Sequence, residues 1–154
     1  MANRFAHVSW QETIAAPPAV VSRQFSDLDH HIRADVHPKL KFEVLERGER
    51  RMRYAQVVRL LGVRQRDVFE RVIGDDGSID DRAVEGPNRG GSIRFRFVPA
   101  GNATRVDVDI TLPVPRGLGW LTPVLTAQVR REVRQAAAQD KADIERGAWS
   151  RRVR

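Results

Sequence analysis

The sequence predicts an α+β fold, in which a curved, seven-stranded antiparallel sheet is wrapped around one long C-terminal helix and two short helices follow the first strand. Three observations carry this prediction. Seven short stretches are rich in apolar residues or alternate between apolar and polar residues, as β-strands do. The breaks between the last six are too short for anything but hairpins, which makes neighbouring strands antiparallel. A late stretch instead repeats apolar residues every three or four positions, which is the period of a helix.

The first strand is expected at residues 5–14, where apolar and polar side chains alternate. An Ala-Ala-Pro-Pro run then ends the strand, and proline suits the first turn of a short helix at 18–25. Ser26-Asp27 predicts the N-cap of a second short helix, from about 27 to 36. Pro38 should end that helix, because the residue before a proline is driven out of the helical conformation.

Six further strands are expected between residues 40 and 113, separated by turn residues, chiefly glycine with Asp, Asn or Pro. Their stretches are residues 41–47, 51–61, 66–73, 79–86, 92–99 and 104–113. In the second of these, Tyr54, Gln56 and Val58 alternate with arginines, so one face of the sheet is predicted to be buried and the other to face water.

The long helix is expected at residues 118–147. Its apolar stripe comprises Leu118, Leu121, Leu125, Val129, Val133, Ala136, Ala137 and Ile144. Asp140 falls on the same stripe, where a carboxylate would need a partner if it were buried. Pro123 lies inside the pattern and should either kink the helix or mark its true start.

This order of elements and three local motifs resemble the helix-grip superfamily, also called SRPBCC, which includes START lipid-transfer domains, the birch-pollen allergen and bacterial polyketide cyclases/dehydratases. Residues 13–18 (Thr-Ile-Ala-Ala-Pro-Pro), followed by Phe25-Ser26-Asp27, resemble the opening of that family. Residues 44–48 and 97–106 are similar to its second and its sixth-to-seventh strands. The resemblance implies a single domain over residues 1–147, followed by a basic tail at 148–154.

The resemblance also implies a cavity between the sheet and the C-terminal helix that binds a hydrophobic or amphipathic small molecule, such as a lipid, a polyketide or an isoprenoid. The superfamily hosts carriers, cyclases, hydrolases and oxygenases, so turnover of the ligand stays open. The residues that we expect to contact the ligand are Trp10, Tyr54, Gln56, Val108, Leu125 and Val129. Tyr54 and Gln56 would orient it in an otherwise apolar pocket.

Glu12 is the candidate catalytic residue of a cyclase/dehydratase-like reaction. It shares a face of the first strand with Val8, Trp10 and Ile14, which predicts that it points into the cavity. A carboxyl group in an apolar cavity has a raised pKa and can act as a general acid or base. The alternative is that the end of the strand is wet and that Glu12 pairs with an arginine.

Three of the four histidines lie within eight residues, and they define a candidate metal site. His30 and His37 are two helical turns apart, so they should share one face of the second helix, with His31 pointing elsewhere. The stretch loosely resembles the iron-binding segment of Rieske-type oxygenases, whose ligands would correspond to His30, His37 and Asp140, preceded by Asp27. Two imidazoles and one carboxylate suit a single non-heme iron or zinc ion.

Two features depart from that resemblance. The two histidines are farther apart than in those oxygenases, and the chain has no cysteine to hold a Rieske cluster. The alternative interpretation is that His30 and His31 are surface residues and that His37-Pro38 is a helix-to-strand turn. In that case the protein needs no cofactor.

Charge and composition add a second alternative and an expected location. The 27 basic residues exceed the 20 acidic ones, which gives a net charge of +7. Five arginines on the expected sheet exterior could contact RNA, the ribosome or an anionic lipid surface: Arg51, Arg53, Arg59, Arg64 and Arg66. A chain without cysteine, signal peptide or long apolar run is expected in the cytoplasm.

Overall fold

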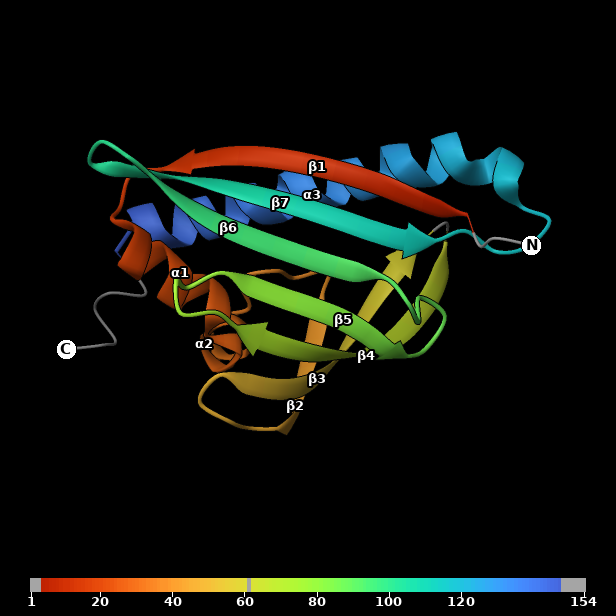
Figure 1. Ribbon diagram of the computed structural model, residues 1–154, viewed down its shortest axis with the longest axis horizontal. Helices are drawn as coiled ribbons and strands as arrows, with labels where there is room; N and C mark the ends of the chain where they lie inside the picture. The colour runs from red at the N-terminus through yellow and green to blue at the C-terminus, as the bar shows by residue number, and fades with distance from the viewer. Residues whose placement is uncertain (1–3, 61, 148–154) are drawn as a thin grey trace.

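The computed structural model describes residues 4–60 and 62–147 (Figure 1). The strands are β1 (Phe5–Ile14), β2 (Lys41–Glu46), β3 (Arg51–Leu60), β4 (Val63–Ile73), β5 (Ile79–Glu85), β6 (Ser92–Ala100) and β7 (Ala103–Pro113). The helices are α1 (Pro18–Ser26), α2 (Leu28–Arg33), a 3₁₀ turn η1 (Gly119–Leu121) and α3 (Thr122–Glu145). The expected basic tail at 148–154 lies outside the described residues.

The seven strands form one antiparallel sheet in the order β1-β7-β6-β5-β4-β3-β2. Strands β2 to β7 follow one another as hairpins, as the short breaks predicted. The first strand returns to pair with the last, from Phe5 opposite Pro113 to Ile14 opposite Thr104. The predicted seven-stranded antiparallel sheet is therefore confirmed.

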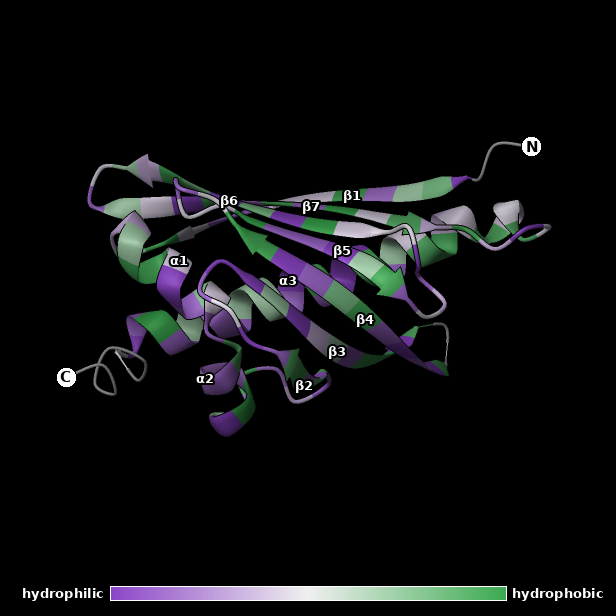
Figure 2. Ribbon diagram, turned by 60° about the horizontal axis from the view of Figure 1, so that its bottom comes forward, coloured by the Kyte–Doolittle hydropathy of each residue, from purple (hydrophilic) through white to green (hydrophobic). Residues whose placement is uncertain are grey.

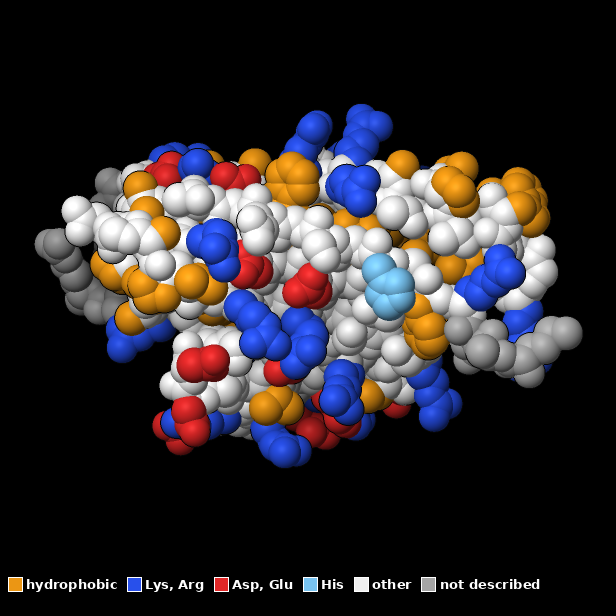
Figure 3. Space-filling view, turned by 45° about the horizontal axis from the view of Figure 1, so that its top comes forward, with side chains coloured by type: hydrophobic (Ala, Val, Ile, Leu, Met, Phe, Trp, Pro, Cys, Tyr) orange, Lys and Arg blue, Asp and Glu red, His pale blue; other side chains and the backbone are white. Residues whose placement is uncertain are grey.

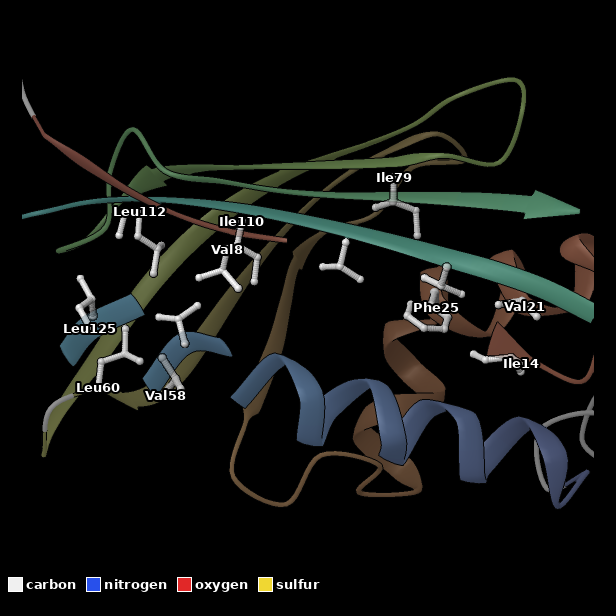
Figure 4. Packing of buried hydrophobic residues seen from close by; sticks show 14 of the residues in the cluster. Val8, Ile14, Val21, Phe25, Val58, Leu60, Ile79, Ile110, Leu112 and Leu125 are labelled. Atoms are coloured by element: carbon white, nitrogen blue, oxygen red, sulfur yellow. The ribbon is translucent and has the colours of Figure 1, made fainter. Parts of the chain in front are cut away.

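The helix α3 lies along one face of this sheet, packed mainly on β1 (Figure 1). Apolar and polar residues alternate along the strands, as the banding of Figure 2 shows. On β7 the alternation buries Val106, Val108, Ile110 and Leu112 on the face toward α3. Figure 4 shows part of the resulting hydrophobic core, between the sheet and α3.

The two short helices close one end of the space between the sheet and α3. They differ from the prediction in one respect. Helix α2 ends at Arg33 rather than near residue 36, because the chain turns at Asp35, which has a positive φ of 47°. His37 therefore lies in the segment that follows the helix, and the expectation that it shares a helical face with His30 was wrong.

Pro123 lies in the first turn of α3, so it marks the true start of the helix. The residues just before it form the 3₁₀ turn η1 instead of a helical extension. No helix in the described part of the chain is both long enough and apolar enough to cross a membrane.

Asp27 forms the N-cap of α2, as predicted, because its Oδ1 accepts a hydrogen bond of 3.0 Å from the backbone N–H of His30. We expect Asp27→Ala to lower the free energy of unfolding by about 1 kcal/mol, since it removes the cap of a short helix. Asp27→Ser should keep most of that stability. Urea unfolding of the three proteins measures the difference, and an Asp27→Ala protein as stable as the parent would contradict this role.

Candidate functional site

A cavity of about 170 Å³ lies between the sheet and α3. Its wall is mostly apolar. The apolar lining residues include Phe25, Leu28, Phe42, Val58, Leu60, Phe69, Ile93, Phe95, Ile110, Leu112, Val133, Ala136 and Ala137. An apolar cavity of about 150 Å³ is large enough to hold benzene. In the described conformation the space therefore suits a molecule of one or two rings, or a short acyl chain.

Four of the six residues expected to contact a ligand lie on the wall of this cavity: Tyr54, Gln56, Val108 and Val129. Trp10 and Leu125 do not. They belong to the hydrophobic core beside the cavity, with Leu125 buried and Trp10 half-buried. The alternation of apolar and polar residues along the strands identified the correct face of the sheet. It does not show which positions on that face are covered by neighbouring side chains.

Tyr54 belongs to a buried polar network with Arg71 and Asp81, on three adjacent strands. The Tyr54 hydroxyl donates to Asp81 Oδ2 at 2.7 Å, and Arg71 Nε donates to Asp81 Oδ1 at 2.8 Å. Arg71 Nη2 donates to Asp81 Oδ2 at 2.8 Å, which makes the pair bidentate. Arg71 Nη1 also donates to the carbonyl oxygen of Phe25, near the C-terminus of α1. The network thus ties α1 to the sheet.

Arg71 and Asp81 were missed in the sequence, although a signal was present. Both occupy inward positions of alternating strands, where an arginine or an aspartate needs a buried partner. Burial alone would lower the pKa of Arg71, but the charge of Asp81 outweighs it and the pKa is raised. The two charges therefore neutralise each other on the cavity wall.

Burial raises the pKa of Tyr54 well above the ordinary value, and the nearby charge of Asp81 raises it further. Tyr54 is the only tyrosine in the chain, so its titration can be followed by near-ultraviolet absorbance. In the folded protein we expect no tyrosinate signal at pH about 10, where an exposed tyrosine is half ionised. The urea-unfolded protein should ionise there. Half-ionisation at that pH in the folded state would contradict the buried network.

The Arg71–Asp81 pair should stabilise the fold far more than an exposed pair nearby. Asp81→Ala leaves a buried, unpaired guanidinium, and we expect it to lower the free energy of unfolding by about 3–5 kcal/mol. The neighbouring Asp80 pairs with Arg94 in solvent, and Asp80→Ala should cost about 1 kcal/mol or less. Urea denaturation of both variants measures the contrast. Equal losses would show that Asp81 is not buried as described.

A second buried polar cluster joins α1, α2 and the segment after α2 to the inner face of α3. His31 Nε2 lies 2.8 Å from Asp140 Oδ1, and His37 Nε2 lies 3.2 Å from Asp140 Oδ2. His30 instead lies 2.7 Å from Asp143 Oδ2. The expectation that His31 points elsewhere was wrong, because both histidines of α2 reach carboxylates on α3.

Gln24 links the two carboxylates of this cluster. Its Nε2 donates to Asp140 Oδ1 and to Asp143 Oδ2, both at 3.0 Å. Its Oε1 and His30 Nδ1 are buried without a hydrogen-bond partner among the described residues. All three histidines and both carboxylates are buried, with side chains at most 7% exposed.

The hydrogen bonds of His31 determine where its protons lie. Its Nδ1 is 2.7 Å from the carbonyl oxygen of Asp27, which can only accept, so Nδ1 carries a proton. Its Nε2 then faces a carboxylate oxygen of Asp140, which also accepts when ionised. The two contacts hold the imidazole ring of His31 in one orientation against Asp140.

His37 and Asp140 stabilise each other's charged forms. Burial opposes the charge of His37, but the charge of the Asp140 carboxylate and the hydrogen bonds that His37 donates to Asp140 and Gln139 outweigh burial and raise the pKa of His37. Burial likewise opposes the charge of Asp140, and the two histidines overcome it and hold the pKa of Asp140 well below its usual range. Three groups that can hold or release protons therefore share one part of the cavity wall.

Glu12 lies on the face of β1 that the alternation predicted, but it is not among the residues that line the cavity. Its Oε1 is 3.4 Å from Nζ of Lys141 on α3, and its side chain is 23% exposed. The structure thus gives Glu12 an ion-pair partner, a lysine rather than the arginine considered from the sequence. Its catalytic role stays a prediction without support from its position.

The arginine-rich exterior lies on β3 and β4, where acidic side chains partly offset it. Arg53 pairs with Glu70 at 2.8 Å, and Arg66 lies 3.7 Å from Glu43. On the face shown in Figure 3, basic and acidic side chains are also intermixed. Binding of RNA, the ribosome or an anionic lipid surface through these five arginines (Arg51, Arg53, Arg59, Arg64 and Arg66) stays a prediction.

Comparison with known proteins places this geometry in context. A family model described as polyketide cyclase/dehydrase and lipid transport matches residues 6–145. No curated protein sequence matches the chain.

Solved structures with the same fold cover nearly the whole chain. A protein from Thermus thermophilus has a TM-score of 0.82 at 23% identity, covering 92% of this chain and 98% of its own. The Zhui aromatase/cyclase from a Streptomyces species has a TM-score of 0.82 at 20% identity, covering 94% and 96%. A START superfamily protein from Mycobacterium smegmatis has a TM-score of 0.76 at 17% identity, covering 92% and 98%. At these identities the likeness establishes the fold.

Proposed function

The chain belongs to the polyketide cyclase/dehydrase and lipid transport family, and within that family we propose that it binds a small, mostly hydrophobic molecule in the cavity between the sheet and α3. The observation that carries the proposal is the cavity itself, which combines an apolar wall with two separate buried polar groups. Family membership supports ligand binding or cyclisation at the level of the class. The volume favours a ligand of one or two rings.

The two polar groups favour an amphipathic ligand with at least one oxygen. At one part of the wall Tyr54, Arg71 and Asp81 form a network whose polar groups bond to one another. At another, His31 and His37 surround Asp140 and can exchange protons with a ligand oxygen. A ligand hydroxyl or carbonyl should therefore lie at the histidines, with the rings against the aromatic side chains of the sheet.

Narrowing the cavity should remove binding. Ala137 is buried and lines the cavity, whereas the adjacent Ala138 is exposed on the same helix. With 2-naphthol as the probe, we expect Ala137→Leu to weaken binding at least about tenfold, because the added carbons occupy the ligand's space. Ala138→Leu should leave the dissociation constant within about twofold.

Fluorescence titration measures both constants, and thermal unfolding checks that both variants are folded. A folded Ala137→Leu protein that binds 2-naphthol as tightly as the parent would contradict the proposed location.

A second candidate function is acid–base catalysis on the bound molecule, of the cyclase/dehydratase type. The specific observation that favours it is the His31–Asp140–His37 group on the cavity wall, because catalysis of a dehydration needs groups that both take and return a proton. Native mass spectrometry of freshly purified protein, repeated after incubation, separates the two functions. A co-purified ligand that loses one water during incubation supports catalysis, and an unchanged ligand supports carriage.

A further inference from the structure

The donor atoms of His31, His37 and Asp140 converge. One ligand atom from each lies within 4.8 Å of the others, and all three residues are buried. The Nε2 atoms of the two histidines are 2.8 Å and 3.2 Å from the carboxylate oxygens. Ligands about 2.0–2.2 Å from a tetrahedral metal ion are about 3.3–3.6 Å apart, so small side-chain shifts suffice to admit one.

The second ring nitrogen of each of the two histidines, His31 and His37, is held by an oxygen of the protein. His31 Nδ1 lies 2.7 Å from the carbonyl oxygen of Asp27, and His37 Nδ1 lies 2.8 Å from Gln139 Oε1. An Nδ1–H bonded to an oxygen fixes the orientation and tautomer of an imidazole and leaves Nε2 for the metal. Gln24 Nε2 also donates to Asp140 Oδ1 and helps to hold the carboxylate in place.

Charge balance points the same way. Two carboxylates, Asp140 and Asp143, are buried side by side, and neither forms an ion pair with a lysine or arginine within residues 4–60 and 62–147. The histidines offset these charges only while they are protonated on both ring nitrogens, and a cation bound to Nε2 of His31 and His37 would replace the protons there. One divalent cation supplies the same charge as two such protons.

We propose that His31, His37 and Asp140 bind one divalent transition-metal ion of the Zn²⁺ and Fe²⁺ class. Two imidazoles and one carboxylate suit these ions better than Ca²⁺ or Mg²⁺, which prefer oxygen ligands. All three residues line the cavity, so a ligand oxygen can reach the remaining coordination position. The site goes beyond the proposed function, because the cavity can hold an apolar molecule without it.

Isothermal titration of tag-free, chelator-treated protein with Zn²⁺ tests the proposal, and Fe²⁺ added without oxygen forms a second arm. We expect one ion per chain. His31→Ala and His37→Ala should each weaken binding more than 100-fold, beyond the roughly 10–100-fold cost of losing an outer contact. Gln139→Ala should weaken it by about 10–100-fold. His7→Ala, which alters the exposed fourth histidine, should bind as the parent does.

The Gln139→Ala variant keeps all three metal ligands, so its metal affinity tests the proposal even if a histidine variant fails to fold. Zn²⁺ should also raise the melting temperature of the parent but not of a folded His37→Ala protein. Failure of the parent to bind either ion, or equal binding by folded His37→Ala, would overturn the site. Binding of 2-naphthol by the same proteins separates that outcome from failure of the proposed function.

Discussion

Asp140 and Asp143 are the constraint on which the rest of the structure depends. Both lie on the inner face of α3, where an unpaired carboxylate would destabilise the fold by several kcal/mol. Their partners are Gln24 on α1, two histidines on α2 and His37 just after it. Burial of these two charges therefore determines where both short helices pack, and with them the closed end of the cavity.

The cavity exists because α3 is too small to cover the whole inner face of the sheet. One helix packed mainly on β1 cannot fill the concave face of a seven-stranded sheet. The strands far from β1 contribute large side chains such as Phe42, Tyr54 and Phe69, and these narrow the gap without closing it. The Arg71–Asp81 pair sits within this region and holds the C-terminus of α1 against the sheet. The remaining space is apolar with polar groups on its wall, which is the form of a small-molecule site.

The fold could be predicted from the sequence because the spacing of apolar residues and the turn residues are local signals. Strand alternation identified the inward face that carries Tyr54, Gln56 and Val108, and the start of α3 at Pro123 was one of the two outcomes expected there. The site could be predicted only in part, because it depends on how elements cross. We expected His30 to lie with His37 at Asp140 and His31 to point elsewhere, whereas His31 contacts Asp140 and His30 contacts Asp143. Helical spacing could not show this, because it does not determine how α2 is oriented against α3. Arg71 and Asp81 carried a signal, a charge at an inward strand position, that was overlooked.

Methyl NMR on valine-labelled protein tests most directly whether a ligand binds between the sheet and α3. The account predicts that 2-naphthol shifts the methyl signals of Val58, Val108 and Val129, which line the cavity. The exposed Val63, Val72 and Val124 serve as internal controls and should keep their positions. Shifts confined to the exposed valines, or no shift at saturating 2-naphthol, would contradict the central claim.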